Sequence, residues 1–311
     1  MKRHQQGKKA LGSQALLTIV TKDGIDEVTV FNNLWAVISD FESRFSRFQT
    51  TSELTHFNSR AGEKVLVSTE FAELLEACRA MSHKTDGLFN PFILPSLNKA
   101  GYIGSWPAPN NFSEELNFEG RTKVVPMNEL RLGTGWAKIP SDTALDFGGI
   151  GKGFLLDQLG NYLQLQGIED FWLSLGGDIL CSGHDANTEP WSISIQDATR
   201  NTELVGTISN SGNTVLGVAT SGVTKRKGVR QGLAWHHIID PRTGEPAVTD
   251  ILTATVSAAT ATEADILAKC VVIIGSTQAK TLVSKHKISQ LYLQLSDGQT
   301  HVLKYATGVE L

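Results

Sequence analysis

The stretch Asp-Phe-Gly-Gly-Ile-Gly-Lys-Gly occupies residues 146–153, and half of its residues are glycine. Glycine has no Cβ atom, so the backbone here can adopt positive φ angles and approach a bound molecule closely. An amphipathic run at 154–165 follows directly, which predicts a turn that leads into a helix. The first N–H groups of such a helix can receive a phosphate group. The alternative is a tight strand-to-helix connection without a ligand, and the pattern alone favours neither.

The composition of the 311-residue chain is that of a globular protein with a sizeable core. Hydrophobic residues make up 41% and charged residues 19%, which excludes disordered and fibrous classes. The formal net charge of -4 gives no electrostatic basis for binding nucleic acid. The three cysteines are widely spaced and odd in number, which argues against a disulfide framework or a zinc cluster.

The amino terminus, MKRHQQGKK, is basic, and we expect residues 1–8 to be disordered. The apolar run that follows, 15–20, is too short for the core of a signal peptide. No stretch approaches the roughly 20 apolar residues that a membrane helix needs. We therefore expect a cytoplasmic protein with reduced cysteines and no membrane segment.

Strand-like and helix-like patterns interleave along the chain, which predicts a mixed α/β or α+β protein. Apolar residues at helical spacing predict helices at 33–48, 70–83, 261–274 and 277–286. Strand patterns occupy 15–20, 171–175, 191–195, 252–256, 290–295 and 300–305. Asp297-Gly298 lies between the last two runs and predicts a hairpin.

The helix expected from residue 261 has a well-specified start. Thr260 and Glu263 form a capping box, in which each side chain bonds to the backbone of the other residue. Asp265 and Lys269 are four residues apart and share one face of this helix. One interpretation of the two is an ordinary helical ion pair, worth about 0.3–0.5 kcal/mol.

The segment 236–246 concentrates polar chemistry at a turn that Asp-Pro and Thr-Gly punctuate. A histidine such as His237 can accept or donate a proton near neutral pH, and Arg242 can clamp a phosphate through paired N–H donors. The alternative is a well-fixed turn in which Asp240 and Arg242 bond to the backbone. The two interpretations are compatible.

Several motifs, taken in their order, resemble those of the ApbE family. They are D-F-G-G-I-G-K-G at 146–153, S-L-G-G-D-I at 174–179, A-T-S-G at 219–222, H-I-I-D-P-R-T-G at 237–244 and A-T-E-A-D at 261–265. S-E-L-T-H-F-N at 52–58 and D-G-L-F-N-P at 86–91 resemble the family's amino-terminal motifs, so the resemblance covers nearly the whole chain. It implies a single α+β domain over 9–311, with two closely packed lobes, roughly 9–140 and 141–311, and a flavin cleft between them.

The resemblance also implies an activity, that of an FAD:protein FMN transferase. Such enzymes bind FAD and a divalent cation, usually Mg²⁺, and split the pyrophosphate. They move FMN onto a Thr or Ser hydroxyl of an acceptor flavoprotein and release AMP. The reaction needs cationic groups to neutralise the developing charge and a base to deprotonate the nucleophile.

By motif position, the resemblance implies that Asp146 and Lys152 contact FAD and that His237 is a candidate proton acceptor. It implies a metal site formed by the carbonyl oxygen of Gly149, the carboxylate of Asp265 and a hydroxyl one helical turn later. The expected catalytic residues are His237, as the proton acceptor, and Asp265, as the metal ligand. The other residues implied for flavin binding are Gly148, Gly149, Phe89, Asn90, Thr220, Ser221 and Arg242.

Three departures separate this chain from the family pattern. Lys269 stands where the family usually has the metal-ligating Thr, and an ammonium has no acceptor with which to ligate a cation. The segment 89–92, F-N-P-F, replaces F-D-P-T, and 11–13, L-G-S, replaces M-G-T.

Three functions therefore stay open. The first is a transferase with an adjusted magnesium site, or with Lys269 itself facing the pyrophosphate. The second is a non-catalytic FAD-binding carrier, sensor or scaffold. The third is an FAD pyrophosphatase in which water replaces the protein hydroxyl.

Overall fold

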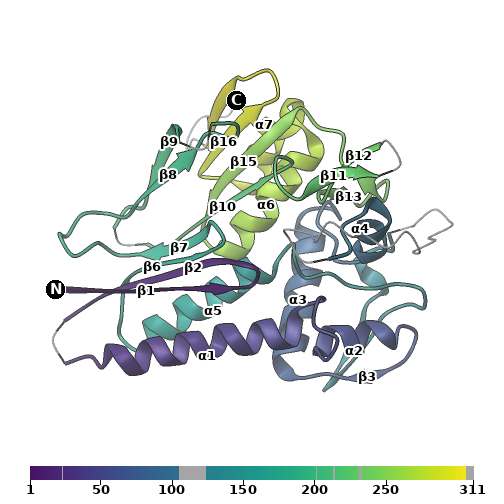
Figure 1. Ribbon diagram of the computed structural model, residues 1–311, viewed down its shortest axis with the longest axis horizontal. Helices are drawn as coiled ribbons and strands as arrows, with labels where there is room; N and C mark the ends of the chain where they lie inside the picture. Colours follow the sequence, from purple (N-terminus) through teal and green to yellow (C-terminus); the bar gives the residue numbers. More distant parts are fainter. Residues whose placement is uncertain (23, 105–123, 201, 213, 231–232, 306–311) are drawn as a thin grey trace. The chain divides into compact units, whose positions relative to one another are not determined.

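The computed structural model describes residues 1–22, 24–104, 124–200, 202–212, 214–230 and 233–305 (Figure 1). Its internal contacts divide the chain into two compact units, which we describe separately. Unit 1 comprises residues 1–42, 150–222 and 249–311, and unit 2 comprises residues 43–149 and 223–248. Both units combine segments that are distant in sequence. This division differs from the expected lobes 9–140 and 141–311, and the expected cleft between lobes stays a prediction.

Unit 1 is built on an eight-stranded antiparallel sheet. Its strands, in spatial order, are β1 (Lys2–Ala10), β2 (Ser13–Thr21), β6 (Asp170–Leu175), β7 (Asp178–Ser182), β10 (Leu216–Gly222), β15 (Ile251–Ala258), β16 (Gln290–Leu295) and β17 (Thr300–Lys304). The pairing of β2 with β6, from Ala15 opposite Leu175 to Val20 opposite Asp170, draws the amino-terminal hairpin into this sheet. The division by internal contacts therefore does not follow the boundary expected near residue 140.

The amino terminus is ordered, so the expectation of a disordered start at residues 1–8 was wrong. β1 pairs with β2 along its whole length, from Lys2 opposite Thr21 to Ala10 opposite Ser13 (Figure 1). Leu11 and Gly12 form the two-residue loop, and both have positive φ angles, +52° and +67°. Positive φ at both loop residues is the type I′ geometry, whose twist suits a hairpin.

Four helices accompany this sheet. They are α1 (Glu27–Phe45), α5 (Gly151–Leu165), α6 (Ala261–Ile274) and α7 (Ser276–His286). The unit division falls within α1, after Glu42. α6 packs on β10 and β15, α5 packs on β6 and β7, and the two helices pack against each other. A separate hairpin consists of β8 (Ser192–Gln196) and β9 (Leu204–Ser209).

Unit 2 contains short helices and small antiparallel sheets. Its helices are α2 (Glu53–Ser59), α3 (Thr69–Lys84), α4 (Leu94–Ala100) and the 3-10 turn η1 (Met127–Glu129). Its strands are β3 (Val65–Leu66), β4 (Arg131–Gly133), β5 (Trp136–Lys138), β11 (Lys227–Arg230), β12 (Leu233–His236), β13 (Ile239–Asp240) and β14 (Glu245–Pro246). The rings of Phe45, Phe57, Phe71 and Phe147 pack together in its core, with centroids 5.1–6.3 Å apart.

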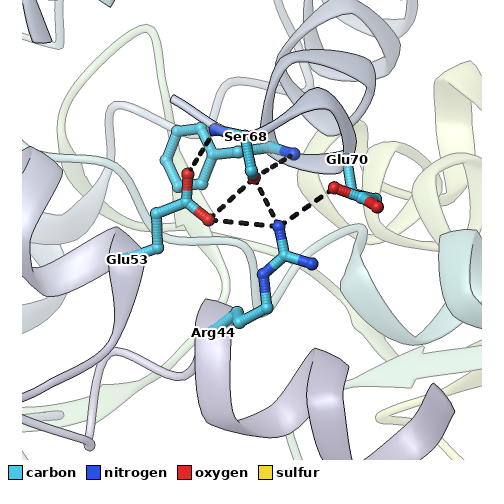
Figure 2. A network of polar contacts seen from close by, with 5 residues as sticks. Arg44, Glu53, Ser68 and Glu70 are labelled. Carbon is cyan, nitrogen blue, oxygen red and sulfur yellow. Dashed lines mark hydrogen bonds and ion pairs between the residues drawn. The ribbon is translucent and has the colours of Figure 1, made fainter. Parts of the chain in front are cut away.

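A polar network ties together three helix ends of unit 2 (Figure 2). Ser68 caps α3 by accepting from the N–H of Phe71 at 3.2 Å. Glu53, the first residue of α2, accepts from the backbone N–H and the hydroxyl of Ser68 at 2.7 and 2.8 Å. Arg44, at the end of α1, contacts Glu53, Ser68 and Glu70. Part of the S-E-L-T-H-F-N motif therefore organises the fold of unit 2.

The structure confirms the predicted α+β class, with antiparallel pairing in each described sheet. The helix at 261–274 has the expected bounds, whereas the helix expected at 154–165 begins earlier, at Gly151. Lys152 therefore lies in the first turn of a helix and not before it. Within the described ranges, the structure contains no helix with the length and apolar character of a membrane span.

Candidate functional site

Four charged side chains of unit 1 form a cluster, which we call the lysine–aspartate cluster. The Lys152 ammonium contacts the Asp178 carboxylate, and the Lys269 ammonium contacts the Asp265 carboxylate. Lys269 Nζ also donates to the backbone carbonyl oxygen of Asp265 at 3.2 Å. The aspartate side chains are almost fully buried, at 3% and 2% exposure, whereas the lysine side chains are 21% and 18% exposed. With two cations and two anions, the cluster has no formal net charge.

The fold places these four groups by local means. Lys152 occupies the first turn of α5, and Asp178 begins β7 directly after a turn at Gly176-Gly177, where φ is +63° and +97°. Such angles are accessible to glycine at little cost. Asp265 and Lys269 lie one turn apart on α6.

α5 approaches the start of α6 closely because residue 153 is glycine. A Cβ atom at Gly153 would lie 2.6 Å from the carbonyl oxygen of Ala261, which is closer than real contacts allow. Asp157, one turn further along α5, accepts from the backbone N–H groups of Ala261 and Thr262 at 2.8 and 3.0 Å. The helix that carries Lys152 therefore also caps the helix that carries Asp265.

The two ion pairs act on each other electrostatically. Burial raises the pKa of the Asp178 carboxyl above its ordinary value, and the negative charge of Asp265 raises it further. The ammonium groups of Lys152 and Lys269 oppose this rise. Because the charges of Lys152, Asp265 and Lys269 all shift the pKa of Asp178, the four groups are electrostatically coupled.

The α6 residues do not fit a divalent cation. Lys269 has three donors and no acceptor, and its ammonium is engaged with the oxygen atoms of Asp265 that a metal would use. The other carboxylate oxygen, Oδ2 of Asp265, is buried and has no hydrogen-bond partner among the described residues. The described part of the chain also holds no group of three or more His, Cys, Asp or Glu side chains arranged for a metal. Gly149, the other expected ligand, belongs to unit 2.

The other expected flavin-binding residues of unit 1 lie on β10. The hydroxyl of Thr220 is 2.9 Å from the hydroxyl of Thr255 on β15, and the Thr220 side chain is exposed. Ser221 is buried and lies opposite Ala254 in the sheet. Thr220 and Ser221, which are adjacent in the A-T-S-G motif, therefore lie on opposite faces of one strand.

In unit 2, Asp146 is held before the glycine turn by an arginine. Arg47 Nε lies 3.0 Å from Asp146 Oδ2, and both side chains are less than a tenth exposed. Asp146 Oδ1 accepts from the N–H of Gly148 at 2.9 Å, and a Cβ atom at Gly148 would lie 2.8 Å from the same oxygen. Arg47 also donates to the carbonyl oxygen of Tyr102 at 2.9 Å. Arg47 therefore already neutralises the carboxylate that we expected to contact FAD.

Two sets of hydrogen bonds fix the backbone at Leu145 and at Asp146. Asn58 bonds to both backbone polar groups of Leu145, donating at 2.9 Å and accepting at 2.8 Å. The N–H of Asp146 donates to the carbonyl oxygen of Pro91 at 2.8 Å. The motif at 52–58 thus positions the residue before the turn, a role that its sequence did not indicate.

The expected flavin-contacting residues Phe89 and Asn90 are buried within unit 2. The Asn90 side chain donates to the carbonyl oxygen of Val125 at 2.8 Å and accepts from the N–H of Phe92 at 2.9 Å. The N–H of Phe89 donates to the hydroxyl of Thr85 at 3.1 Å. These bonds use Asn90 to hold the local backbone.

The segment 236–246 combines a fixed turn with an aromatic surrounding. His236 Nε2 lies 3.0 Å from the carbonyl oxygen of Ala247, and His236 Nδ1 accepts from the N–H of Ile238 at 3.3 Å. These partners suit a neutral imidazole with the proton on Nε2, and burial lowers the pKa of His236. The next residue, His237, places its ring 6.1 Å from that of Tyr102, edge to face.

Arg242 forms a two-oxygen ion pair with Asp240, at 2.8 Å between Nη2 and Oδ2 and 2.9 Å between Nε and Oδ1. The backbone N–H of Arg242 bonds to the same carboxylate at 2.9 Å. The Arg242 side chain is 55% exposed, so its guanidinium remains accessible to solvent. The fixed-turn interpretation of this segment therefore agrees with the geometry, and phosphate binding by Arg242 stays a prediction.

Sequence reasoning missed Arg47 and Asp178. The glycine pair before Asp178 was a signal for it, because a tight turn can aim an acid that directly follows. Arg47 lies in an apolar helical run, and nothing in its sequence surroundings distinguishes it from a solvated arginine.

Comparison with known proteins gives a consistent result. The profile of the ApbE family matches residues 11–292. An FAD:protein FMN transferase from Vibrio cholerae is 25% identical over 290 residues, which cover 92% of this chain and 86% of the relative. The solved flavin transferase ApbE from Vibrio cholerae has a TM-score of 0.79 at 23% identity, over 98% of each chain. The ApbE protein from Thermotoga maritima has a TM-score of 0.82 at 24% identity, over 96% of each chain. At these identities the structural likeness shows the fold.

Proposed function

Because the chain belongs to the ApbE family, we propose that it transfers FMN from FAD to a Thr or Ser hydroxyl of an acceptor flavoprotein and releases AMP. The observation that carries this proposal is the extent of the family match, which spans residues 11–292 and so includes the glycine turn and the motifs after it. The relative from Vibrio cholerae that covers most of this chain carries the same activity in its name.

In the proposed reaction, the acceptor hydroxyl oxygen attacks the phosphorus of the FMN half of FAD. A new phosphoester bond forms, and the bond from that phosphorus to the bridging oxygen breaks. AMP leaves with the bridging oxygen, and the hydroxyl proton passes to a base. Within unit 2, we assign this base to His237, whose ring lies against Tyr102.

Within unit 1, we assign hydrogen bonding to the phosphate oxygen atoms to the ammonium groups of Lys152 and Lys269. Each is about one-fifth exposed and is anchored by a buried aspartate. A cation fixed in this way needs no reorganisation when negative charge develops on a phosphate. The proposed reaction uses no divalent cation, because the α6 residues do not fit one.

A second candidate function is supported by the contact between Lys269 and Asp265. If the ammonium only blocks the position of a metal, the chain binds FAD without cleaving it, as a carrier, sensor or scaffold. The glycine turn and its anchors serve this function equally well. Turnover therefore separates the two candidates.

The test is incubation of the purified chain with FAD and an acceptor flavoprotein domain, with AMP measured by chromatography. Acceptor-bound flavin is measured by fluorescence after denaturation. The transferase predicts equal amounts of AMP and covalent flavin, and no covalent flavin on an acceptor whose target hydroxyl residue is replaced by alanine. AMP together with free FMN, regardless of acceptor, would identify a pyrophosphatase. FAD binding without AMP would establish the non-catalytic candidate.

A further inference from the structure

We propose that the Lys269 ammonium takes the place of a divalent cation in unit 1, so that the chain contacts phosphate oxygen atoms through lysine N–H donors alone. The inference starts from the disagreement between the α6 residues and a metal site. Its consequence for FAD rests on the proposed function, whereas its consequence for metal binding does not.

The first argument is the occupation of ligand atoms. Lys269 Nζ contacts Oδ1 of Asp265 and lies 3.2 Å from the backbone carbonyl oxygen of the same residue. Oxygen atoms of this kind are the ligands that Mg²⁺ prefers. A metal that used these two oxygen atoms would therefore have to displace the ammonium from its charged hydrogen bond, and the remaining oxygen, Oδ2, is buried.

The second argument is charge balance. Lys152 and Lys269 already balance Asp178 and Asp265, and both aspartates are nearly inaccessible to water. A divalent ion added to this neutral cluster would leave two uncompensated positive charges in a poorly solvated place. Displacing the charged hydrogen bond alone should weaken metal binding roughly 10- to 100-fold.

The third argument is what the lysines offer to a ligand. Their side chains are the exposed members of the cluster, and an ammonium presents three donors. Asp265 engages Lys269 through one side-chain and one backbone oxygen, so the ammonium retains capacity for a further acceptor. A pyrophosphate supplies such acceptors, and we infer that it binds here without a metal.

The experiment measures binding of Mn²⁺, a spectroscopic probe for Mg²⁺ sites, by paramagnetic resonance on the full chain. The variants are Lys269→Thr, which removes the ammonium and adds a hydroxyl, and Lys269→Met, which removes the ammonium and adds no oxygen. Lys280→Thr, on the exposed surface of α7, is the matched control for the change of charge and residue type.

We expect Lys269→Thr to bind Mn²⁺ roughly 10- to 100-fold more tightly than the native chain. Lys269→Met should fall between the two, and Lys280→Thr should match the native chain. The melting temperature of Lys269→Thr should rise when Mg²⁺ is added, and that of the native chain should not. Equal Mn²⁺ affinity of the native chain and Lys269→Thr would overturn the proposal.

If Lys269→Thr does not fold, the native chain still decides the matter. Saturable Mn²⁺ binding by the native chain that Asp265→Asn abolishes would overturn the proposal, and its lack would support it. The affinity for FAD, measured with EDTA and with Mg²⁺, should agree within about twofold, which is below the effect of losing a single hydrogen bond.

The failure of the two proposals can be told apart. Flavin transfer that requires Mg²⁺ would overturn the proposal that the lysine–aspartate cluster works without a metal, and it would leave the transferase function intact. Weak Mn²⁺ binding and metal-independent FAD binding without transfer would overturn the transferase function. The proposal for the lysine–aspartate cluster would then still hold.

Discussion

Because α5 and α6 approach closely at Gly153, replacing this glycine should force the two helices apart and destabilise unit 1. In Gly153→Ala, the new Cβ atom would lie 2.6 Å from the carbonyl oxygen of Ala261 and 2.8 Å from the Cα atom of Thr262. Both are backbone atoms at the start of α6, which cannot rotate away. The helices must therefore separate, and this moves Lys152 relative to Asp265.

The expected magnitude combines two opposing terms. Overpacking of a well-packed core costs about 1–3 kcal/mol. Alanine gains about 1 kcal/mol over glycine in a helix interior. Because the obstructing atoms are backbone, we expect the upper part of the first range, and a net loss of about 1–2 kcal/mol in the free energy of unfolding.

Gly160→Ala provides the matched control on the same helix. Its Cβ atom would meet Leu180 Cδ2 at 2.5 Å, the end of a side chain that can change rotamer. Alanine raises the helix propensity in both variants, so the comparison depends mainly on what each new Cβ atom meets. Urea unfolding followed by circular dichroism should show the larger loss for Gly153→Ala. Equal stability of the two variants, or a more stable Gly153→Ala, would refute the reasoning about helix approach.

Further predictions concern caps, acid stability and thiols. Asp157→Asn should lose about 1–3 kcal/mol in urea unfolding, because its carboxylate accepts from the backbone and hydroxyl of Thr262; an unchanged midpoint would contradict the capping role. The pKa of His236 is lowered by burial, so its neutral form is favoured by folding and stability should fall as pH drops below about 6.5. A His236→Gln variant should lose part of this dependence, and an identical pH profile would count against it. Burial raises the pKa of the Cys181 thiol to about 12 and also raises that of Cys78, so neither should react with a thiol reagent at mildly alkaline pH until the chain is unfolded. Rapid labelling of either cysteine in the native chain would contradict their burial.

Local signals in the sequence predicted α6 well. Thr260 accepts from the N–H of Glu263 at 3.1 Å, as the capping pattern indicates, and the helix has the expected bounds. The second cap, Asp157, comes from a helix about a hundred residues earlier, so no local pattern reveals it. The interpretation of Asp265 and Lys269 as an ion pair agrees with the structure, but a surface magnitude does not apply, because the Asp265 side chain is 2% exposed.

Tertiary contacts explain what the sequence did not show. The basic residues of 1–8 indicate a solvated tail, yet an edge strand can point such side chains to solvent while its backbone pairs with β2.

β10 contains Gly217, which weakens its strand pattern. A Cβ atom there would lie 2.3 Å from the carbonyl group of Thr260, so the start of α6 requires glycine at this position.

The expected site residues show the same limit. Helical spacing indicated that Lys269 pairs with Asp265, but motif position did not show that Arg47 already pairs with Asp146. Such pairing depends on side chains that reach across the fold or along a helix face. The chemistry available to a carboxylate changes when a cation is fixed against it, because its charge is then already compensated.

The most direct measurement of the central claim is the mass of an acceptor flavoprotein domain after incubation with this chain and FAD. The reaction is run once with EDTA and once with Mg²⁺. The account predicts that the acceptor gains the mass of one FMN group under both conditions, with an equal amount of AMP released. The account would be contradicted if the mass of the acceptor stayed unchanged under both conditions while a separate measurement showed that this chain binds FAD.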